Sequence, residues 1–327
     1  MLDPKRGSNL HIFIKMDKTL GSKKKIQRTF SKYLHGNSNY ILDDLIKKNN
    51  KFQLIISSPP YNMDREYEKT SSLDNYLEEI ESIITKLVLL LDKKGSICWQ
   101  VGNYINKKTK EIFPLDIFYY TVFKKHNLQL RNRIVWHFEH GLHASQRFSG
   151  RYETILWFTK NENYIFNLDD VRVPAKYPGK TYYKGAKKGE LSGNPKGKNP
   201  SDIWEIVLKD WEKEIWEIPN VKANHKEKTI HPCQYPIELV ERCILAFTNQ
   251  GDWILDPFAG VGSTLIAARK NKRNSVGIEL HEDYIKIGEN RIADLKKGKL
   301  KFRKLGTPVF IPNANTAVAK VPNHFYI

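Results

Sequence analysis

The feature that most constrains the fold is a strand–turn–helix–strand unit in the last third of the chain. A short apolar run at residues 253–256 leads into a turn with Gly260 and Gly262, and residues 265–270 have helical composition. A second apolar run follows and ends at Glu279. Short buried strands that alternate with helices are typical of α/β folds, which bind ligands at the carboxyl ends of their strands.

The same unit predicts a site for a ligand that carries a ribose. Gly260 and Gly262 let the backbone approach a ligand closely, and Ser263 and Thr264 are expected to cap the helix that follows. Glu279 lies about 20 residues after the glycines, a spacing at which a carboxylate can bind ribose hydroxyls. The missing third glycine and the Asp-Pro-Phe start of the turn argue against NAD.

A second turn, Ser58-Pro59-Pro60-Tyr61, follows a short apolar run at residues 52–57. The two prolines fix φ and lack N–H donors, so the carbonyl groups of the turn remain as outward-facing acceptors. Tyr61 adds an aromatic face. Acceptors beside a stacking ring suit a flat heterocycle with an exocyclic amino group. The alternative is a plain Pro-Pro loop after a core strand.

Together, Ser-Pro-Pro-Tyr and Asp-Pro-Phe-Ala-Gly-Val-Gly-Ser-Thr resemble the motifs of the S-adenosylmethionine-dependent DNA amino-methyltransferases of type II restriction–modification systems. The catalytic motif comes first, an order similar to the beta class of that family. The resemblance extends from about Tyr33 to about Leu295. It implies an α/β, circularly permuted Rossmann-like fold with a mostly parallel seven-stranded sheet, helices on both faces and an inserted target-recognition region.

The resemblance also divides the chain into five parts. It implies a basic N-terminal arm at residues 1–30, the catalytic half of the methyltransferase domain at 31–160, the target-recognition region at 161–224, the cofactor-binding half at 225–297 and a C-terminal tail at 298–327. The cofactor would be S-adenosylmethionine, with no metal.

Roles for individual residues follow from the same resemblance. The Ser58 hydroxyl and the carbonyl groups of Ser58 and Pro59 would bind the target amino group, and Tyr61 would stack on the base. The implied catalytic residues are Ser58, Pro59, Pro60 and Tyr61. The implied cofactor-binding residues are Asp256, Phe258, Gly260, Gly262, Ser263, Thr264, Glu279 and His231.

The expected reaction is in-line transfer of a sulfonium methyl group to an exocyclic nitrogen. That nitrogen is a poor nucleophile because its lone pair delocalises into the ring, so acceptors that favour its pyramidal form would lower the barrier. The base is inaccessible inside a duplex and would have to flip out. The mechanism needs neither a metal nor a covalent intermediate.

The identity of the base depends on the first motif residue. In this family, a serine at that position resembles the motif of the N4-cytosine enzymes, whereas Asp or Asn resembles the motif of the N6-adenine enzymes. We expect methylation of cytosine N4 in duplex DNA, with adenine N6 as the alternative. More distant alternatives are an RNA or protein methyltransferase, disfavoured by the permuted order and the basic insert, and a non-catalytic DNA-binding protein, which would not need both motifs.

Charge also indicates a nucleic-acid partner. The net charge is +18, with 54 basic and 36 acidic residues, which suits a polyanion, although a lysine-biased composition would give the same sign. Residues 171–200 hold eight basic residues and one acidic residue among five glycines and four prolines, so an irregular target-recognition segment is expected, with a solvated linker as the alternative. The predicted DNA-binding residues are Arg147, Arg151, Lys176, Lys180, Lys184, Lys187 and Lys188.

The Pro232-Cys233-Gln234 run resembles the cytosine-C5 methyltransferase motif, but it lies in the wrong place. In that family the dipeptide follows the catalytic strand, a position that Ser-Pro-Pro-Tyr holds here. The run instead resembles the His/Lys-Pro motif that borders the methionine end of the cofactor, through His231. Cys233 is therefore expected to be incidental to the reaction.

The remaining expectations concern location and partners. No apolar stretch approaches the roughly 18 residues of a membrane span, and the N-terminus lacks a charged-then-apolar signal pattern, so a cytoplasmic protein is expected. The expected partners are double-stranded DNA and a cognate restriction endonuclease on a separate chain, since the sequence shows no nuclease motif. A monomer and a homodimer both remain open.

Overall fold

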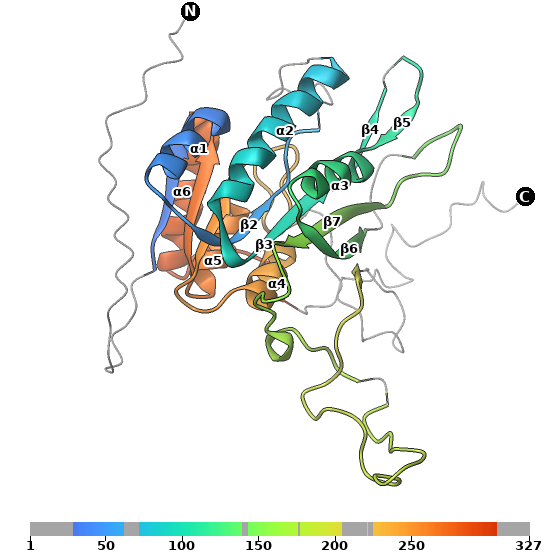
Figure 1. Ribbon diagram of the computed structural model, residues 1–327. Coiled ribbons are helices and arrows are strands. Elements are labelled where there is room, and N and C mark those ends of the chain that lie inside the picture. Colours follow the sequence, from blue (N-terminus) through green and yellow to red (C-terminus); the bar gives the residue numbers. More distant parts are fainter. Residues whose placement is uncertain are drawn as a thin grey trace, which may run out of the picture.

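A mixed sheet forms the centre of the computed structural model, which describes residues 29–61, 72–106, 108–138, 143–175, 177–204, 221 and 225–305 (Figure 1). The strand order is β1-β10-β9-β2-β3-β7-β6-β8. The strands are β1 (Ser31–His35), β2 (Phe52–Ser57), β3 (Leu91–Val101), β6 (Gln129–His137), β7 (Tyr152–Thr159), β8 (Ile203–Trp204), β9 (Trp253–Asp256) and β10 (Asn274–Glu279). Most of the N-terminal arm, Lys176 and the tail beyond residue 305 lie outside the described residues.

Neighbouring strands run parallel except around β7, which is antiparallel to both β3 and β6. This confirms the mostly parallel α/β fold. The sheet has eight strands where seven were expected. The extra strand, β8, is only two residues long and pairs in parallel with the end of β6. It comes from the region after the basic segment, at the start of an apolar run at residues 203–208 that only Glu205 interrupts.

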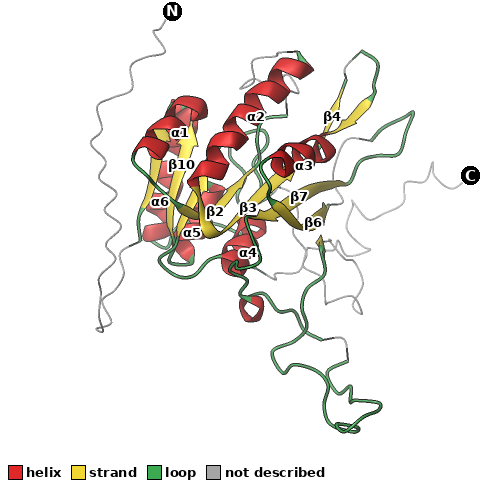
Figure 2. Ribbon diagram, in the orientation of Figure 1, coloured by secondary structure: helices red, strands yellow, loops and turns green. Residues whose placement is uncertain are grey.

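Helices cover both faces of the sheet (Figure 2). The helices are α1 (Ser38–Lys47), α2 (Leu73–Leu90), α3 (Leu115–Lys125), α4 (Ile237–Phe247), α5 (Ser263–Lys270) and α6 (Glu282–Lys296). Alternate residues of β2 explain the layers, since successive side chains of a strand point to opposite faces. Ile55 packs with α1, α2 and α3, whereas its neighbours Leu54 and Ile56 pack with α4, α5 and α6. Phe52, which lies before a register shift in the pairing of β2 with β3, also packs with α1, α2 and α3.

The centre of the sheet joins segments that are far apart in the sequence. Leu54 of β2 pairs with Ile254 of β9, and β1 pairs along its whole length with β10. The two turns that carry the sequence motifs therefore begin at the carboxyl ends of adjacent parallel strands. The two turns are therefore neighbours in space although about 200 residues separate them in the sequence.

In the basic segment, residues 171–200, the described residues 171–175 and 177–200 contain no helix or strand and extend away from the sheet at the lower right of Figure 1. It is built from turns and three isolated bridges, one of which, Val173 with Lys198, closes its base. A two-stranded sheet of β4 (Asn103–Ile105) and β5 (Ile112–Pro114) and a short 3-10 helix, η1 (Leu168–Asp170), complete the described elements.

Candidate active site

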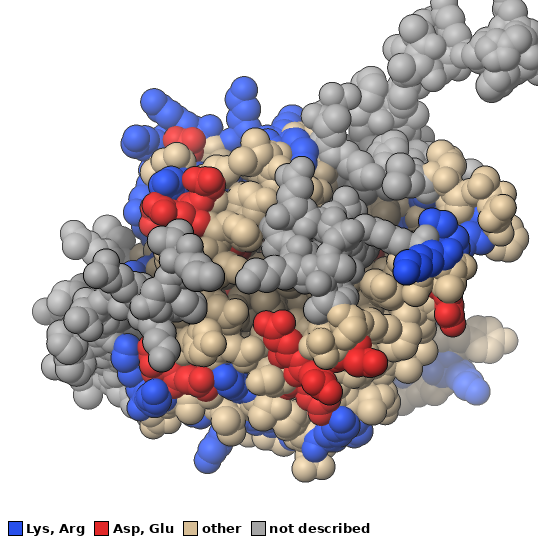
Figure 3. All heavy atoms as spheres, turned by 90° about the horizontal axis from the view of Figure 1, so that it is seen from above, with Lys and Arg blue, Asp and Glu red and all other residues tan. Residues whose placement is uncertain are grey.

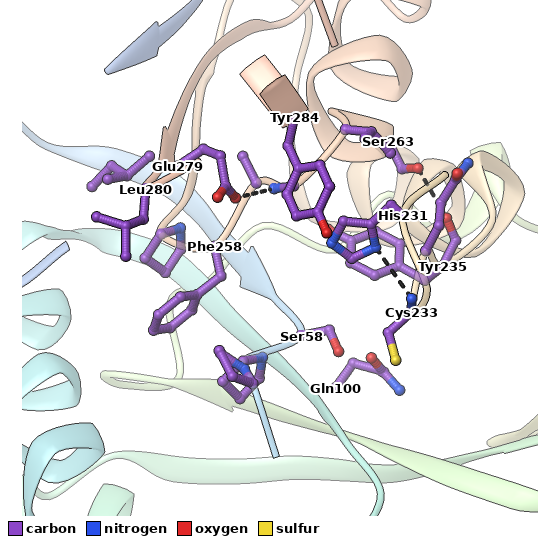
Figure 4. Close-up of a pocket in the computed structure, with 18 of the residues that line it drawn as sticks. Ser58, Gln100, His231, Cys233, Tyr235, Phe258, Ser263, Glu279, Leu280 and Tyr284 are labelled. Carbon is purple, nitrogen blue, oxygen red and sulfur yellow. Dashed lines mark hydrogen bonds between the residues drawn. The ribbon is translucent and has the colours of Figure 1, made fainter. Parts of the chain in front are cut away.

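A cavity of about 420 Å³ lies where the parallel strands end (Figure 4). This is within the usual range for a small-molecule site. Four segments supply most of its wall: residues 58–61 after β2, 257–261 after β9, 278–281 at the end of β10, and 231–235 before α4. The two turns predicted from the sequence thus face one shared space.

In the turn after β2, hydrogen bonds fix the Ser-Pro-Pro-Tyr motif. The Ser58 and Tyr61 hydroxyl oxygens are 3.1 Å apart. The buried Tyr76 hydroxyl donates to the Pro60 carbonyl at 2.7 Å and lies 2.6 Å from the Tyr119 hydroxyl. The Pro60 carbonyl is therefore engaged by a side chain of α2. Burial raises the pKa of Tyr61, so its ring is that of a neutral phenol.

The turn after β9 needs glycine for both its conformation and its contacts. Gly260 and Gly262 have φ values of 49° and 82°, in the left-handed region that favours glycine. The Tyr33 hydroxyl donates to the Gly260 carbonyl at 3.1 Å, and a Cβ on Gly262 would lie only 2.4 Å from that hydroxyl. Glu279 closes the turn by accepting from the Gly260 N–H at 2.8 Å.

Asp256 is completely buried and joins the two turns without lining the cavity. Its carboxylate accepts hydrogen bonds from four donors: Ser57 Oγ at 2.6 Å, Tyr235 Oη at 2.7 Å, Thr264 Oγ1 at 2.5 Å and the Phe258 N–H at 3.0 Å. Ser57 immediately precedes the Ser-Pro-Pro-Tyr turn, so one carboxylate fixes the relative position of both turns.

The expectation that Ser263 and Thr264 cap α5 is wrong. The N-cap is Gly262, and no side chain caps the helix. The Ser263 hydroxyl donates to the Tyr235 carbonyl at 2.9 Å, and Thr264 donates to Asp256. Both hydroxyls therefore join the loop before α4 to the glycine turn. Ser263 lines the cavity, whereas Gly262 and Thr264 lie behind its wall.

The side of the cavity near the Ser-Pro-Pro-Tyr turn contains residues that the sequence motifs do not include. Trp136 and Phe138 at the end of β6, Gln100 of β3 and Glu153 of β7 all line it. Figure 4 shows Ser58 and Gln100 on one side of the cavity and Glu279 and Tyr284 on the other. The carboxyl-end rule applied to β3 would have identified Gln100, but Glu153 reaches the site only because β7 runs antiparallel.

The known proteins that this chain resembles are DNA methyltransferases. A family model described as DNA methylase, covering the N6 and N4 enzymes, matches residues 52–290. The chain is 43% identical to the Type II methyltransferase M.BglII of Bacillus subtilis over 79% of this chain and 67% of that protein. It is 29% identical to the DNA adenine methyltransferase YhdJ of Escherichia coli K12 over 77% and 82%, respectively.

The chain belongs to the DNA amino-methyltransferase family. Two solved structures share its fold. The PvuII DNA methyltransferase, described as cytosine-N4-specific, superposes with a TM-score of 0.57 at 18% identity, over 83% of this chain and 93% of that one. The M1.HpyAVI–SAM complex gives 0.54 at 19% identity, over 80% and 99%.

S-adenosylmethionine is the cofactor of this amino-methyltransferase, and the cavity wall fits it. The glycine turn leaves space against the cavity that a side chain would fill, because a Cβ on Gly260 would lie 3.2 Å from His231 Nε2. Burial, with help from the nearby Lys228 charge, lowers the pKa of His231 to about 4. A neutral imidazole adds no positive charge beside a sulfonium ion. The His231 ring also packs 4.6 Å from that of Tyr284.

The predicted DNA-binding residues that the structure describes, all except Lys176, do not line the cavity. Arg147 is exposed, and Arg151 is half-buried and donates to the Gly150 carbonyl at 3.0 Å. Of these residues, Lys180, Lys184, Lys187 and Lys188 are exposed, as are Lys196 and Lys198 of the same basic segment. Figure 3, viewed from above, shows Lys and Arg mainly around the periphery of that face and several Asp and Glu nearer its middle.

Two further observations concern the described part of the methyltransferase chain. Its His, Cys, Asp and Glu side chains form no cluster of three or more that could hold a metal ion. None of its helices combines the length and apolar character needed to cross a membrane. Cys233 is exposed and lines the cavity, whereas Cys98 and Cys243 are buried.

Proposed function

We propose that this DNA amino-methyltransferase transfers the methyl group of S-adenosylmethionine to N4 of cytosine in duplex DNA, as the modification enzyme of a type II restriction–modification system. The observation that carries the choice of base is Ser58 at the first position of the motif. Its hydroxyl lies within hydrogen-bonding distance of Tyr61 and lines the cavity, so a neutral group that both donates and accepts occupies the place of the carboxylate or amide found in the adenine enzymes.

In this proposal, each turn has its own ligand. The Ser58 hydroxyl and the Ser58 and Pro59 carbonyls bind the amino group, and Tyr61 stacks on the flipped base. Phe258, Gly260, Ser263, Glu279 and His231 contact the cofactor directly. Asp256, Gly262 and Thr264 do not line the cavity, so their proposed role is to support the turn that contacts the cofactor. Bound S-adenosylmethionine supplies the electrophilic methyl group.

DNA recognition is assigned to the surfaces outside the cavity. The basic segment at residues 171–200, within the proposed target-recognition region at 161–224, contacts phosphates through its exposed lysines and offers Tyr182 and Tyr183 for stacking. The loop that carries Arg147 and Arg151 contacts DNA next to the flipped base. A cognate endonuclease on another chain would cleave sites that lack the methyl group.

The test is mass spectrometry of nucleosides from unmethylated duplex DNA incubated with the protein and S-adenosylmethionine. The proposal predicts N4-methylcytosine. N6-methyladenine would refute the serine-based choice of base but leave the fold, cofactor and flipping mechanism in place. Neither product, on a broad set of sequences and with cofactor binding demonstrated, would refute the DNA assignment, and RNA would be tested next.

A further inference from the structure

Two of the cavity residues outside the motifs are joined to each other, namely Glu153 through its carboxylate and Gln100 through its amide. They lie on the adjacent antiparallel strands β7 and β3. Gln100 is only 5% exposed, and its Nε2 donates to Glu153 Oε2. A buried amide that holds one carboxylate oxygen fixes the direction of the whole carboxylate group.

The carboxylate is directed toward the catalytic turn. A Cβ on Gly102 would lie 3.3 Å from Glu153 Oε1 and 3.3 Å from Tyr61 Cε2, so the acid and the ring approach the same point. The charge of Glu153 is, after burial, a further cause of the raised pKa of Tyr61. The carboxylate therefore lies beside the ring that is proposed to stack on the base.

A carboxylate here suits only one part of the DNA substrate. It would repel phosphates, but it can accept a hydrogen bond from an amino group and favours positive charge on that group. The Ser58 hydroxyl and the backbone carbonyls in the same cavity carry no formal charge. Glu153 therefore supplies a negative charge that the Ser-Pro-Pro-Tyr motif lacks.

We propose that Glu153 is a further catalytic residue, whose carboxylate accepts a hydrogen bond from the target amino group and then the proton that this nitrogen loses. Gln100 is a positioning residue that holds the carboxylate in place. The proposal rests on the proposed function in one respect, that the methyl acceptor is an exocyclic amino group, and it holds for cytosine and adenine alike.

Methyl transfer releases one proton from the target nitrogen, and in this proposal the Glu153 carboxylate receives it. The nitrogen lone pair forms the new N–C bond while the C–S bond breaks and its electron pair stays on sulfur, so the positive charge moves from sulfur to nitrogen. The nitrogen then carries two hydrogens and a methyl group. One proton passes to the Glu153 carboxylate, which becomes a neutral acid and later releases it to water, and the methylated base is left neutral.

The first experiment compares E153Q with E162Q in single-turnover methyl transfer. Glu162 is exposed, follows β7 at its other end and pairs with Arg131 at 3.0 Å, so E162Q removes the same charge without reaching the cavity. E153Q should transfer methyl about 100-fold more slowly or worse, with cofactor affinity close to that of the wild type and DNA affinity lower by at most about 10-fold. E162Q should react at the wild-type rate. E153D, which keeps the charge, should be slowed less than E153Q.

The second experiment measures binding alone. Wild type and E153Q are titrated with matched duplexes that carry either the target cytosine or pyrimidin-2-one, which lacks the amino group, without a methyl donor. Pairing differences between the duplexes affect both proteins equally. The wild type should therefore favour the amino-bearing duplex over the analogue more strongly than E153Q does, by about 10-fold.

Several outcomes would overturn the proposal. One is a transfer rate for E153Q equal to that of the wild type. Another is a loss of rate in E153Q that is no larger than its loss of cofactor or DNA affinity. The third is a preference for the amino-bearing duplex that is the same in E153Q as in the wild type. Failure of the cytosine assignment is separate. If the wild type yields N6-methyladenine, the same comparisons are made with adenine and its analogue purine, and the role of Glu153 is judged on those.

Discussion

Two regions of this methyltransferase are proposed to hold ligands, and they are built in opposite ways. Around the glycine turn, a fully buried carboxylate accepts four hydrogen bonds and locks two turns together. The basic segment is exposed and irregular, and its base is closed by the bridge between Val173 and Lys198. Methyl transfer needs atoms fixed to a fraction of an ångström, whereas phosphate binding sums many charges that each need little precision.

The largest expected effect comes from removing the buried carboxylate of Asp256. D256A removes the acceptor of the Phe258 N–H and of the Ser57, Tyr235 and Thr264 hydroxyl groups, of which Tyr235 and Thr264 can still bond to each other. Each unsatisfied buried group costs about 1–3 kcal/mol. We expect the free energy of unfolding to fall by at least about 3 kcal/mol, as measured by urea denaturation. K184A, in the basic segment, is the control and should leave stability unchanged. A D256A protein as stable as K184A would contradict the locking role.

The next effect separates chemistry from cofactor binding within the cavity. Y61A removes the proposed stacking surface, which is worth about 1–3 kcal/mol per base, so turnover should fall by roughly 5- to 150-fold. Cofactor affinity, measured by calorimetry, should stay the same because Tyr61 lies on the catalytic turn. Unchanged turnover would show that the ring does not stack on the base.

A smaller effect is expected at each position of the exposed region. A variant with alanine at Lys180, Lys184, Lys187 and Lys188 should bind DNA more weakly. The slope of log affinity against log salt should shrink by about 0.9 for each phosphate that the variant no longer neutralises. Its unfolding free energy should match the wild type.

The matched control places alanine at Lys47, Lys48, Lys296 and Lys297. These exposed lysines lie at the ends of α1 and α6, away from the carboxyl edge of the sheet. An equal loss of affinity in both quadruple variants would show that only total charge matters and that the basic segment has no special role.

The smallest effect is expected at Cys233, although this thiol lines the cavity. C233S should transfer methyl groups at nearly the wild-type rate, because the proposed mechanism uses no thiolate. Radiolabelled methyl transfer at saturating DNA measures this directly. A C233S protein that is folded and binds cofactor but is inactive would indicate a covalent mechanism instead.

The sequence predicts the local elements of the structure better than it predicts the contacts between distant segments. The strands ending at Ser57, Asp256 and Glu279 are predictable because apolar runs and glycine turns are local signals. The hydrogen bond between Gln100 and Glu153 is not, because it depends on the register of two antiparallel strands. Ser263 and Thr264 show the limit most clearly. Their hydroxyls suit a helix cap, but tertiary contacts to Tyr235 and Asp256 take precedence.

The pairing of β1 with β10 has a consequence for how the protein is made. In the described sheet, β1 is an edge strand whose neighbour is β10, so Ser31 must wait for Ser275 to leave the ribosome before it can pair. At about 5–20 residues per second, translation takes on the order of ten to fifty seconds to cover that interval. Throughout that time the first strand has an unpaired edge and the catalytic turn lacks the carboxylate that fixes it. A nascent or truncated chain therefore has no assembled site, and DNA modification begins only with a nearly full-length protein.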